Sequence, residues 1–337
     1  MKAVGYRKNL PVTADEALLD LELATPTPGP RDLLVKVKAI SVNPVDVKLR
    51  ARAAPPAGMA RILGFDAAGI VETIGSEVTL FRPGDPVFYA GSITRPGTNA
   101  ELHLVDERIA GHKPKILSFA EAAALPLTSI TAWELLFDRL GVRPGKQPDS
   151  GCLLIIGGAG GVGSILIQLA RRLTGLTVIA TASRPETTAW CRELGAHHVI
   201  DHRQPLAEEL KRVGHPQIEL VASLTNTEQH FAAIAEILKP QGRLAVIDDP
   251  AILDINPLKR KSISVHWEFM FTRSMFETED MIGQHRLLDE IAGLIEAGVI
   301  RTTLNDNLGR IDAANLKKAH ALVESGKARG KIVLEGF

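Results

Sequence analysis

The stretch LLIIGGAGGVGSILIQLARR (residues 153–172) joins a short apolar run to a glycine-rich turn and then to a helical pattern of apolar residues. An apolar run bounded by glycine is typical of a buried strand, and the spacing after the turn predicts a helix over 161–174. A strand, a glycine turn and a helix in this order commonly hold a pyrophosphate. The stretch therefore predicts a dinucleotide-binding α/β domain.

The turn has the spacing G-x-G-x-x-G at Gly158, Gly160 and Gly163. Gly158 permits the tight turn, Gly160 lets the backbone approach the pyrophosphate, and Gly163 lets the helix pack close to the strand. Gly161 and Val162 lie between them, where the helix N-terminus offers free N–H groups and the positive end of its dipole. We expect all five residues to contact the cofactor. The alternative is a glycine turn without a ligand.

The residues after the second predicted strand (177–182) discriminate between NADH and NADPH. An NAD site places Asp or Glu there, about 20 residues after the glycines. This chain has Ser183 and Arg184 instead, with no acidic residue before Glu186. Arginine can pair with a 2′-phosphate and serine can donate a hydrogen bond to it, so NADPH is favoured. His202 and Arg203, after the third strand, are further candidates for the adenosine pocket; solvated surface side chains are the alternative.

Strands and helices continue to alternate after the turn, which predicts a doubly wound parallel sheet of the Rossmann type. Asp248 and Asp249 follow the fifth strand, where the cleft of this fold opens, so Asp248 is a candidate for the cofactor site; a solvated loop is the alternative. Strands are expected at 152–158, 177–182, 197–201, 218–224, 242–248 and 262–269, and helices at 161–174, 186–194, 227–238, 279–298 and 312–325.

The first 120 residues are rich in short alternating segments, which predict a β-barrel or sandwich-like module. Strands are expected at 31–42, 69–78, 84–91 and 100–110, and Pro126 separates or kinks the helices of 119–140. The last strand, 331–336, can rejoin this module. The predicted domains are residues 1–122, completed by about 300–337, and residues 123–299.

Composition excludes several classes of protein. The chain has 337 residues, is 45% hydrophobic, and carries 39 basic and 39 acidic residues. A net charge of zero gives no support to binding of nucleic acid or of a membrane surface. The sequence has no apolar run of membrane-spanning length and no signal peptide. Its two cysteines, Cys152 and Cys191, fit a reducing cytoplasm.

Six further segments carry a family resemblance: SVNPVDVKLR (41–50), GFDAAGIVETIG (64–75), RPGDPVFY (82–89), AALPLTSITAWELL (123–136), GGAGGVG (157–163) and GKIVL (330–334). With them the chain resembles the medium-chain dehydrogenase/reductase superfamily, in its zinc-free quinone oxidoreductase branch. The resemblance implies a GroES-like N-terminal domain, a Rossmann domain, an active site in the cleft between them, and a homodimer or homotetramer.

The resemblance also implies catalytic residues. Asn43 and Asp46 would lie at the floor of the cleft, where Asn43 donates a hydrogen bond to the substrate oxygen or to the ribose. Asp46 would orient Asn43 or a backbone group, and Thr131 matches a position that contacts the nicotinamide side of the cofactor. Each of these residues also has a purely structural interpretation. A helix can start at Pro44 with Asp46 in its first turn, and Thr131 can be a helical threonine bonded to its own backbone.

A catalytic zinc site is not expected. By resemblance, zinc-dependent relatives have a cysteine near the position of Asn43 and a histidine followed by Glu where this chain has Phe65 and Asp66. Both cysteines lie in the predicted dinucleotide domain, and Asp66 or His103 alone makes no metal site. Without a Lewis acid, hydride transfer suits a carbon that is already electrophilic, in a quinone or an α,β-unsaturated carbonyl compound.

The resulting hypothesis is an NADPH-dependent, zinc-independent reductase of such compounds. The alternatives are a zinc-dependent alcohol dehydrogenase and a dinucleotide-binding protein with little catalysis. The proton donor stays open: Tyr89 has a suitable phenol, although packing in the barrel is favoured for it. Segment 266–276 is rich in aromatic residues and suits a substrate lid, a subunit interface or core. Arg329 and Lys331 are weak candidates for a 2′-phosphate.

Overall fold

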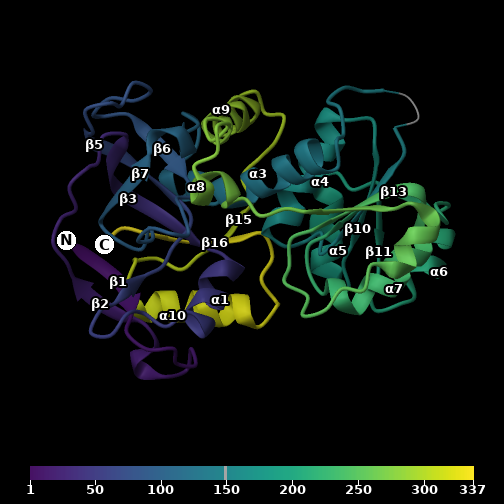
Figure 1. Ribbon diagram of the computed structural model, residues 1–337, viewed down its shortest axis with the longest axis horizontal. Helices are drawn as coiled ribbons and strands as arrows, with labels where there is room; N and C mark the ends of the chain where they lie inside the picture. Colours follow the sequence, from purple (N-terminus) through teal and green to yellow (C-terminus); the bar gives the residue numbers. More distant parts are fainter. Residues whose placement is uncertain (148–149) are drawn as a thin grey trace. The chain divides into compact units, whose positions relative to one another are not determined.

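A computed structural model describes residues 1–147 and 150–337 (Figure 1). Contacts along the chain divide it into two units: residues 1–130 with 271–337, and residues 131–270. The domain limits predicted from the sequence, 122/123 and 299/300, differ from these bounds and stay a prediction. Each unit is described by itself below.

The first unit is built around one long strand, β3 (Asp32–Val42). β3 pairs antiparallel with β5 (Ala67–Ile74), β7 (Leu102–Asp106) and β16 (Lys331–Glu335). The pairing of β16 with β3 confirms that the end of the chain rejoins the N-terminal module. Strands β6 (Pro86–Tyr89) and β8 (Ala110–His112) extend the sheet on the β5 side, and β15 (Leu304–Asn307) extends it beyond β16. A second sheet has the order β2-β1-β4.

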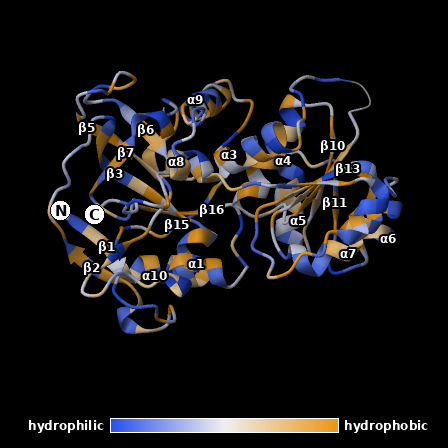
Figure 2. Cartoon of the chain, viewed as in Figure 1, coloured by the Kyte–Doolittle hydropathy of each residue, from blue (hydrophilic) through white to orange (hydrophobic). Residues whose placement is uncertain are grey.

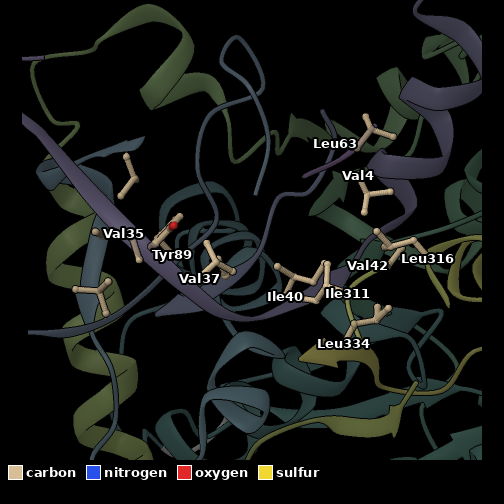
Figure 3. Packing of buried hydrophobic residues seen from close by; sticks show 14 of the residues in the cluster. Val4, Val35, Val37, Ile40, Val42, Leu63, Tyr89, Ile311, Leu316 and Leu334 are labelled. Carbon is tan, nitrogen blue, oxygen red and sulfur yellow. The ribbon is translucent and has the colours of Figure 1, made fainter. Parts of the chain in front are cut away.

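The core of the first unit lies against one face of β3. Val35, Val37, Ile40 and Val42 project from this strand into a buried cluster, which Figure 3 shows together with Tyr89 and side chains from the end of the chain. Along β3, buried and more exposed residues alternate from Val35 to Ala39, as one buried face of a sheet requires, whereas residues 33–34 and 40–42 are all buried. The same cluster includes Leu316 and Leu334, so residues near both ends of the sequence stabilise one core.

The second unit is a six-stranded parallel sheet with the order β11-β10-β9-β12-β13-β14. Numbered from its first strand this order is 3-2-1-4-5-6, the doubly wound topology of dinucleotide-binding domains. The α/β fold class predicted from the sequence, with a β-rich module and a Rossmann-type sheet, is therefore confirmed. The strand order reverses between β9 and β12, so the loops that follow these two strands meet at the switch point of the sheet.

Hydrophobic strands flanked by amphipathic helices produce this sheet. All five residues of β9 (Cys152–Ile156) are buried, as expected for a central parallel strand covered on both faces. Figure 2 shows hydrophobic colouring along these strands and mixed colouring on the surrounding helices. Helix α4 (Gly161–Leu173) buries eight of its residues.

The sequence missed several short elements and set some limits too widely. The helix start expected at Pro44 is confirmed by α1, whereas helix α6 and strands β1, β2 and β15 are not predicted; the helix expected over 279–298 runs from Gly283 to Glu296. Among the described residues no helix is both long and apolar enough to cross a bilayer. The elements not yet given are η1 (Asp15–Ala17), η2 (Glu107–Ile109) and η4 (Asn256–Lys261), which are 3₁₀ turns, η3 (Glu134–Arg139), which is π-helical, β1 (Lys2–Tyr6), β2 (Leu19–Glu22), β4 (Arg61–Ile62), β10 (Thr177–Thr181), β11 (His198–Ile200), β12 (Ile218–Ser223), β13 (Leu238–Val246), β14 (Ser264–Trp267), α1 (Pro44–Arg52), α2 (Phe119–Ala123), α3 (Pro126–Trp133), α5 (Pro185–Glu193), α6 (Leu206–Arg212), α7 (Thr227–Ile237), α8 (Thr272–Phe276) and α10 (Ala313–Glu324).

Candidate active site and cofactor site

The glycine turn leaves β9 and enters α4 in a geometry that only glycine accommodates. A Cβ on Gly163 would lie 2.5 Å from the carbonyl oxygen of Gly157, and one on Gly158 would lie 2.7 Å from the Cβ of Ala180. These distances are too short for any other residue, so both glycines are required by close backbone packing. A Cβ on Gly160 would meet nothing nearer than 3.6 Å. Open space beside Gly160 is what the approach of a pyrophosphate requires.

The N-terminus of α4 supplies the donors. Gly160 precedes the helix with extended backbone, and Gly161 and Val162 form its first turn. The first N–H groups of a helix have no partner within the helix, and they carry the positive end of its dipole. Gly161 and Val162 are both partly exposed. Their N–H groups, together with the space at Gly160, fit the pyrophosphate of a dinucleotide.

The residues after β10 lie where the adenosine ribose is bound in this topology. Ser183 and Arg184 are both partly exposed, immediately before α5. Nε of Arg184 lies 3.3 Å from a carboxylate oxygen of Glu186, an interaction not anticipated from the sequence. The arginine therefore has an acidic neighbour that competes with a phosphate for its charge.

The residues after β11 show a second arrangement. Asp201, the first residue after β11, accepts hydrogen bonds from the backbone N–H and the guanidinium of Arg203. His202 is partly buried, with its ring centroid 6.3 Å from that of His230. Burial lowers the pKa of His202 and so disfavours a positive charge on its imidazole.

Asp248 stabilises the start of α7 by hydrogen bonds. Its carboxylate accepts hydrogen bonds from the backbone N–H of Thr227, at 2.9 Å, and from the hydroxyl of the same residue. That hydroxyl also lies 2.7 Å from the hydroxyl of Ser223, the last residue of β12. Asp248 thus links the ends of β12 and β13 beside the switch point. The structure explains its acidic side chain without a ligand, and a contact through backbone groups stays a prediction.

In the first unit, Asp46 fixes the backbone at the start of α1. Its two carboxylate oxygens accept hydrogen bonds from the backbone N–H groups of Asn43 and Gly64, both at 2.8 Å. The side chain is fully buried. Burial raises the pKa of Asp46 to about 7, against the opposing effect of the two N–H donors and of the charge of Lys331. Asp46 therefore positions Asn43 and the segment before β5.

The amide of Asn43 is held at both ends. Nδ2 donates a hydrogen bond to Asp66 at 2.7 Å, and Oδ1 accepts one from the ammonium of Lys331. Asn43 is 1% exposed, and Lys331 is 3% exposed. Because an ammonium only donates and a carboxylate only accepts, these partners determine which end of the amide is oxygen and which is nitrogen.

Asp66 is the centre of this arrangement. One of its oxygens accepts hydrogen bonds from Ser41, Asn43 and Lys331 at distances of 2.7, 2.7 and 2.9 Å. The other accepts the backbone N–H of Leu127, near the start of α3, at 2.7 Å. We call the five groups contributed by Ser41, Asn43, Asp66, Leu127 and Lys331 the polar centre. Its members come from five segments of the first unit.

Only part of the polar centre can be predicted from the sequence. Asn43 was identified through the resemblance, and Asp66 was noted only as insufficient for a metal site. The weak assignment of Lys331 to a 2′-phosphate is wrong, because its ammonium is buried and donates to three oxygens of the first unit. Arg329 donates to the side-chain oxygen of Asn305 instead. A lysine at the start of an apolar terminal strand indicates that its side chain can be buried. The sequence does not indicate that Asp66 is its partner.

The packing of Tyr89 in the barrel is confirmed, whereas His103, for which an outward or partly buried position is expected, is buried beside it. Tyr89 and His103 are buried, and their rings stack with centroids 5.4 Å apart. His103 Nε2 lies 3.0 Å from the carbonyl oxygen of Pro96, so it donates there, and Nδ1 then accepts from the hydroxyl of Tyr89. Burial lowers the pKa of His103 to about 4 and raises that of Tyr89. Thr131 is 5% exposed in α3.

The aromatic segment 266–276 has no single role. Met270 and Phe271 are buried, and Phe271 packs edge-on against Phe65 with centroids 5.2 Å apart. Trp267 and Phe276 are 55% and 72% exposed. Core packing thus accounts for the middle of the segment, and the exposed rings leave the lid and interface hypotheses open.

Comparison with known proteins now defines the class. Residues 29–131 match the alcohol dehydrogenase GroES-like domain family, and residues 194–334 match the zinc-binding dehydrogenase family. The chain is 43% identical over 339 residues to a zinc-type alcohol dehydrogenase-like protein of Staphylococcus aureus (strain MSSA476), covering 99% of each chain.

Solved structures agree. One from Rhizobium etli CFN 42, provisionally described as a zinc-dependent alcohol dehydrogenase protein, is 60% identical with a TM-score of 0.95 over 100% of this chain and 98% of that one. The quinone oxidoreductase of Escherichia coli, solved in complex with NADPH, is 25% identical with a TM-score of 0.85 over the whole of both chains.

The chain belongs to the medium-chain dehydrogenase/reductase superfamily. Its relatives and structural neighbours include several oxidoreductases, and its dinucleotide-binding fold supports a nicotinamide cofactor.

Zinc, which the family names imply, does not fit the residues that this chain places in the polar centre. Zinc in proteins is bound by thiolate, imidazole and carboxylate groups. The polar centre offers an amide, a hydroxyl and one carboxylate, and that carboxylate is already bonded to a buried ammonium. Phe65, beside Asp66, has no ligating atom. Among residues 1–147 and 150–337, no group of three His, Cys, Asp or Glu side chains could hold a metal ion.

Proposed function

We propose that the protein is an NADPH-dependent, zinc-independent oxidoreductase that reduces quinones or α,β-unsaturated carbonyl compounds. The observation that carries the proposal is the donor chemistry of the polar centre. Asn43, Asp66 and Lys331 satisfy one another by hydrogen bonds and offer no set of metal ligands. A substrate that is already conjugated to an electron-withdrawing oxygen needs only hydrogen-bond donors and a nearby proton source.

The cofactor would be held by residues of the second unit. The N–H groups of Gly161 and Val162 bind the pyrophosphate, and Gly160 leaves the space for it. Arg184 and Ser183 bind the 2′-phosphate of NADPH by charge and by a hydrogen bond. When bound, the nicotinamide supplies the hydride. The cofactor thus carries the chemical step, and the protein orients it.

The first unit would supply the polar contacts for the substrate. Asn43 has a second amide N–H besides the one that it donates to Asp66. We propose that this N–H hydrogen-bonds to the substrate oxygen on which negative charge develops during hydride transfer. Asp46 keeps Asn43 in place through the backbone. Thr131 is proposed to contact the nicotinamide side of the cofactor, and the group that delivers the proton is unassigned.

The first experiment measures oxidation of NADPH and of NADH by chelator-treated protein with a quinone, an enal and a simple ketone. Turnover of the quinone or enal with NADPH preferred is the expected result. Arg184→Ala is expected to raise the KM for NADPH about 10-fold or more while leaving that for NADH unchanged. Arg212→Ala is the matched control, because this exposed arginine in α6 also pairs with a carboxylate, that of Glu209, and is not a candidate for the cofactor site.

Other outcomes would favour the rival functions. Turnover of the ketone alone, abolished by chelation, would indicate a zinc-dependent alcohol dehydrogenase. Tight binding of NADPH without turnover of any compound would indicate a dinucleotide-binding protein with little catalysis. Equal use of both cofactors by the wild type would contradict the role of Arg184.

We also propose a homodimer or homotetramer in the cytoplasm, on the family resemblance and on the two buried free cysteines. Sedimentation of the purified protein measures the oligomeric state, and a monomer would contradict the first part.

A further inference from the structure

Lys331 is the only cationic member of the polar centre, and it is almost fully buried. It begins β16, where its ammonium donates to the backbone carbonyl of Val42 at 3.2 Å, to Asp66 at 2.9 Å and to Oδ1 of Asn43. An ammonium has three donors, and all three are used. Burying an unpaired ammonium costs several kcal/mol, so the acceptors around it are required by its charge.

The surroundings of Lys331 form a cradle of oxygen atoms for a cation. A carboxylate, an amide oxygen and a backbone carbonyl converge on one point from β3, the start of α1 and the segment before β5. The separations of 2.9 and 3.2 Å are those of hydrogen bonds to an ammonium. Metal–oxygen bonds to zinc or magnesium would be close to 2.1 Å. The cradle therefore has the size of an ammonium group.

We propose that Lys331 is a built-in cation that occupies the place of a metal ion in this protein, and that it positions the amide of Asn43. The positioning role rests on the proposed function of Asn43, whereas the occupancy of the cradle does not. Lys331 fixes Oδ1 as the acceptor end of the amide, so the N–H groups point away from Lys331. A flipped amide would direct its N–H groups at the ammonium, so that two hydrogen-bond donors would face each other without an acceptor.

The proposal excludes a direct catalytic role for Lys331. Its three donors are occupied within the first unit, so it has no N–H for a substrate. Asp46, a buried acid whose pKa is raised by burial and lowered in part by the charge of Lys331, accepts hydrogen bonds from backbone N–H groups. The charge of the polar centre is thus balanced internally, and a divalent cation would have to displace the ammonium.

The test removes the ammonium and returns it from solution. Lys331→Ala deletes three methylenes and the amine, which corresponds to n-propylammonium. We expect a lower urea midpoint for this variant and a kcat reduced by about 10- to 100-fold, with little change in the KM for NADPH. Addition of n-propylammonium should raise the midpoint and restore kcat at least several-fold. Tetramethylammonium, which has no N–H donor, should do neither.

Two further variants complete the test. Lys36→Ala is the matched control, because Lys36 also lies in a strand and pairs with a carboxylate, Glu72, but at 48% exposure. It should change neither the midpoint nor the response to amines.

The double variant Asp66→Asn with Lys331→Met keeps the centre neutral. It should have a higher midpoint than Lys331→Ala, yet a reduced kcat, because Asn43 loses both of its charged partners.

The readouts separate this inference from the proposed function. If the wild type turns over none of the compounds, the urea midpoints and the amine response still test the occupancy of the cradle. A Lys331→Ala variant with the urea midpoint of the wild type would overturn the inference. The inference would also be overturned if amines left Lys331→Ala unchanged and the double variant had the same low urea midpoint as Lys331→Ala. Zinc bound stoichiometrically by the wild type and lost in Asp66→Asn would overturn it as well.

Discussion

Two carboxyl groups, one in each unit, are buried to a similar extent but differ in their partners. Asp66 and Glu268 are 0% and 2% exposed. Asp66 accepts hydrogen bonds from an ammonium, an amide, a hydroxyl and a backbone N–H. Glu268 accepts one from Arg139 at 2.9 Å and faces a second buried acid, Glu134. Burial, and then the charge of Glu134, raise the pKa of Glu268.

The difference shows that the partners, and not burial alone, determine the charge of a buried acid. Asp66 has a buried ammonium as a partner and hydrogen-bond donors for both of its oxygens. Glu268 and Glu134 are like charges in a buried place, so one of them keeps a proton. The Glu134–Glu268 pair therefore responds to pH, whereas Asp66 is stabilised by the groups that donate to it.

The largest effect is expected from Asp66→Asn, which leaves the ammonium of Lys331 buried without its counter-charge. Removal of one member of a buried ion pair costs about 3–5 kcal/mol, and we expect a loss in this range, measured by urea unfolding at pH 7. The double variant with Lys331→Met should recover part of it. A loss below about 1 kcal/mol would mean that the ion pair is not the stabilising feature of the polar centre.

A smaller effect is expected when Arg139 is removed from Glu268. Arg139→Gln should cost about 1 kcal/mol or less at pH 6, because the two carboxyl groups can take up a second proton in place of the arginine. The loss should grow as the pH rises and this protonation becomes harder. A loss at pH 6 as large as that of Asp66→Asn would show that the two centres behave alike.

The pH dependence of stability tests Glu268 directly. Because its pKa is raised on folding, the folded state binds the proton more tightly than the unfolded state above the usual pKa range of Glu. The contribution of Glu268 is therefore complete at low pH and is lost as the pH rises. Glu268→Gln cannot ionise, so its free energy of unfolding should decline less between pH 5 and pH 9. Parallel curves for the two proteins would contradict the assignment.

The smallest effect is expected at the pair Arg184–Glu186, whose side chains are 37% and 53% exposed. Glu186→Gln should change the free energy of unfolding by less than about 0.5 kcal/mol. Under the proposed function it should raise the affinity for NADPH about 2- to 5-fold, since a carboxylate beside Arg184 would be removed. Titration of cofactor fluorescence measures this, with Glu193→Gln at the end of α5 as control. Weaker binding of NADPH would place the phosphate elsewhere.

The sequence predicted features whose residues are close neighbours in the chain. The strand β9, the turn and α4 follow within 22 residues, and the need for glycine at position 163 has a local cause, the carbonyl oxygen of Gly157 in the same turn. The hydrogen bond between Asp46 and the N–H of Asn43 spans three residues and could be anticipated from a helix start at Pro44. The contact of Arg184 with Glu186 is equally local, yet charge order alone did not indicate that their side chains meet.

The sequence by itself therefore determined the α/β class, the glycine turn between β9 and α4, and the return of the last strand to the first unit. Each of these is a pattern of apolar and glycine residues with a fixed period. Tertiary structure alone decided that Lys331 pairs with Asp66, 265 positions apart, and that Glu268 faces another acid. Periodicity reports which face of an element is buried, whereas the state of a buried charge depends on which distant donors and acceptors the folded chain brings to it.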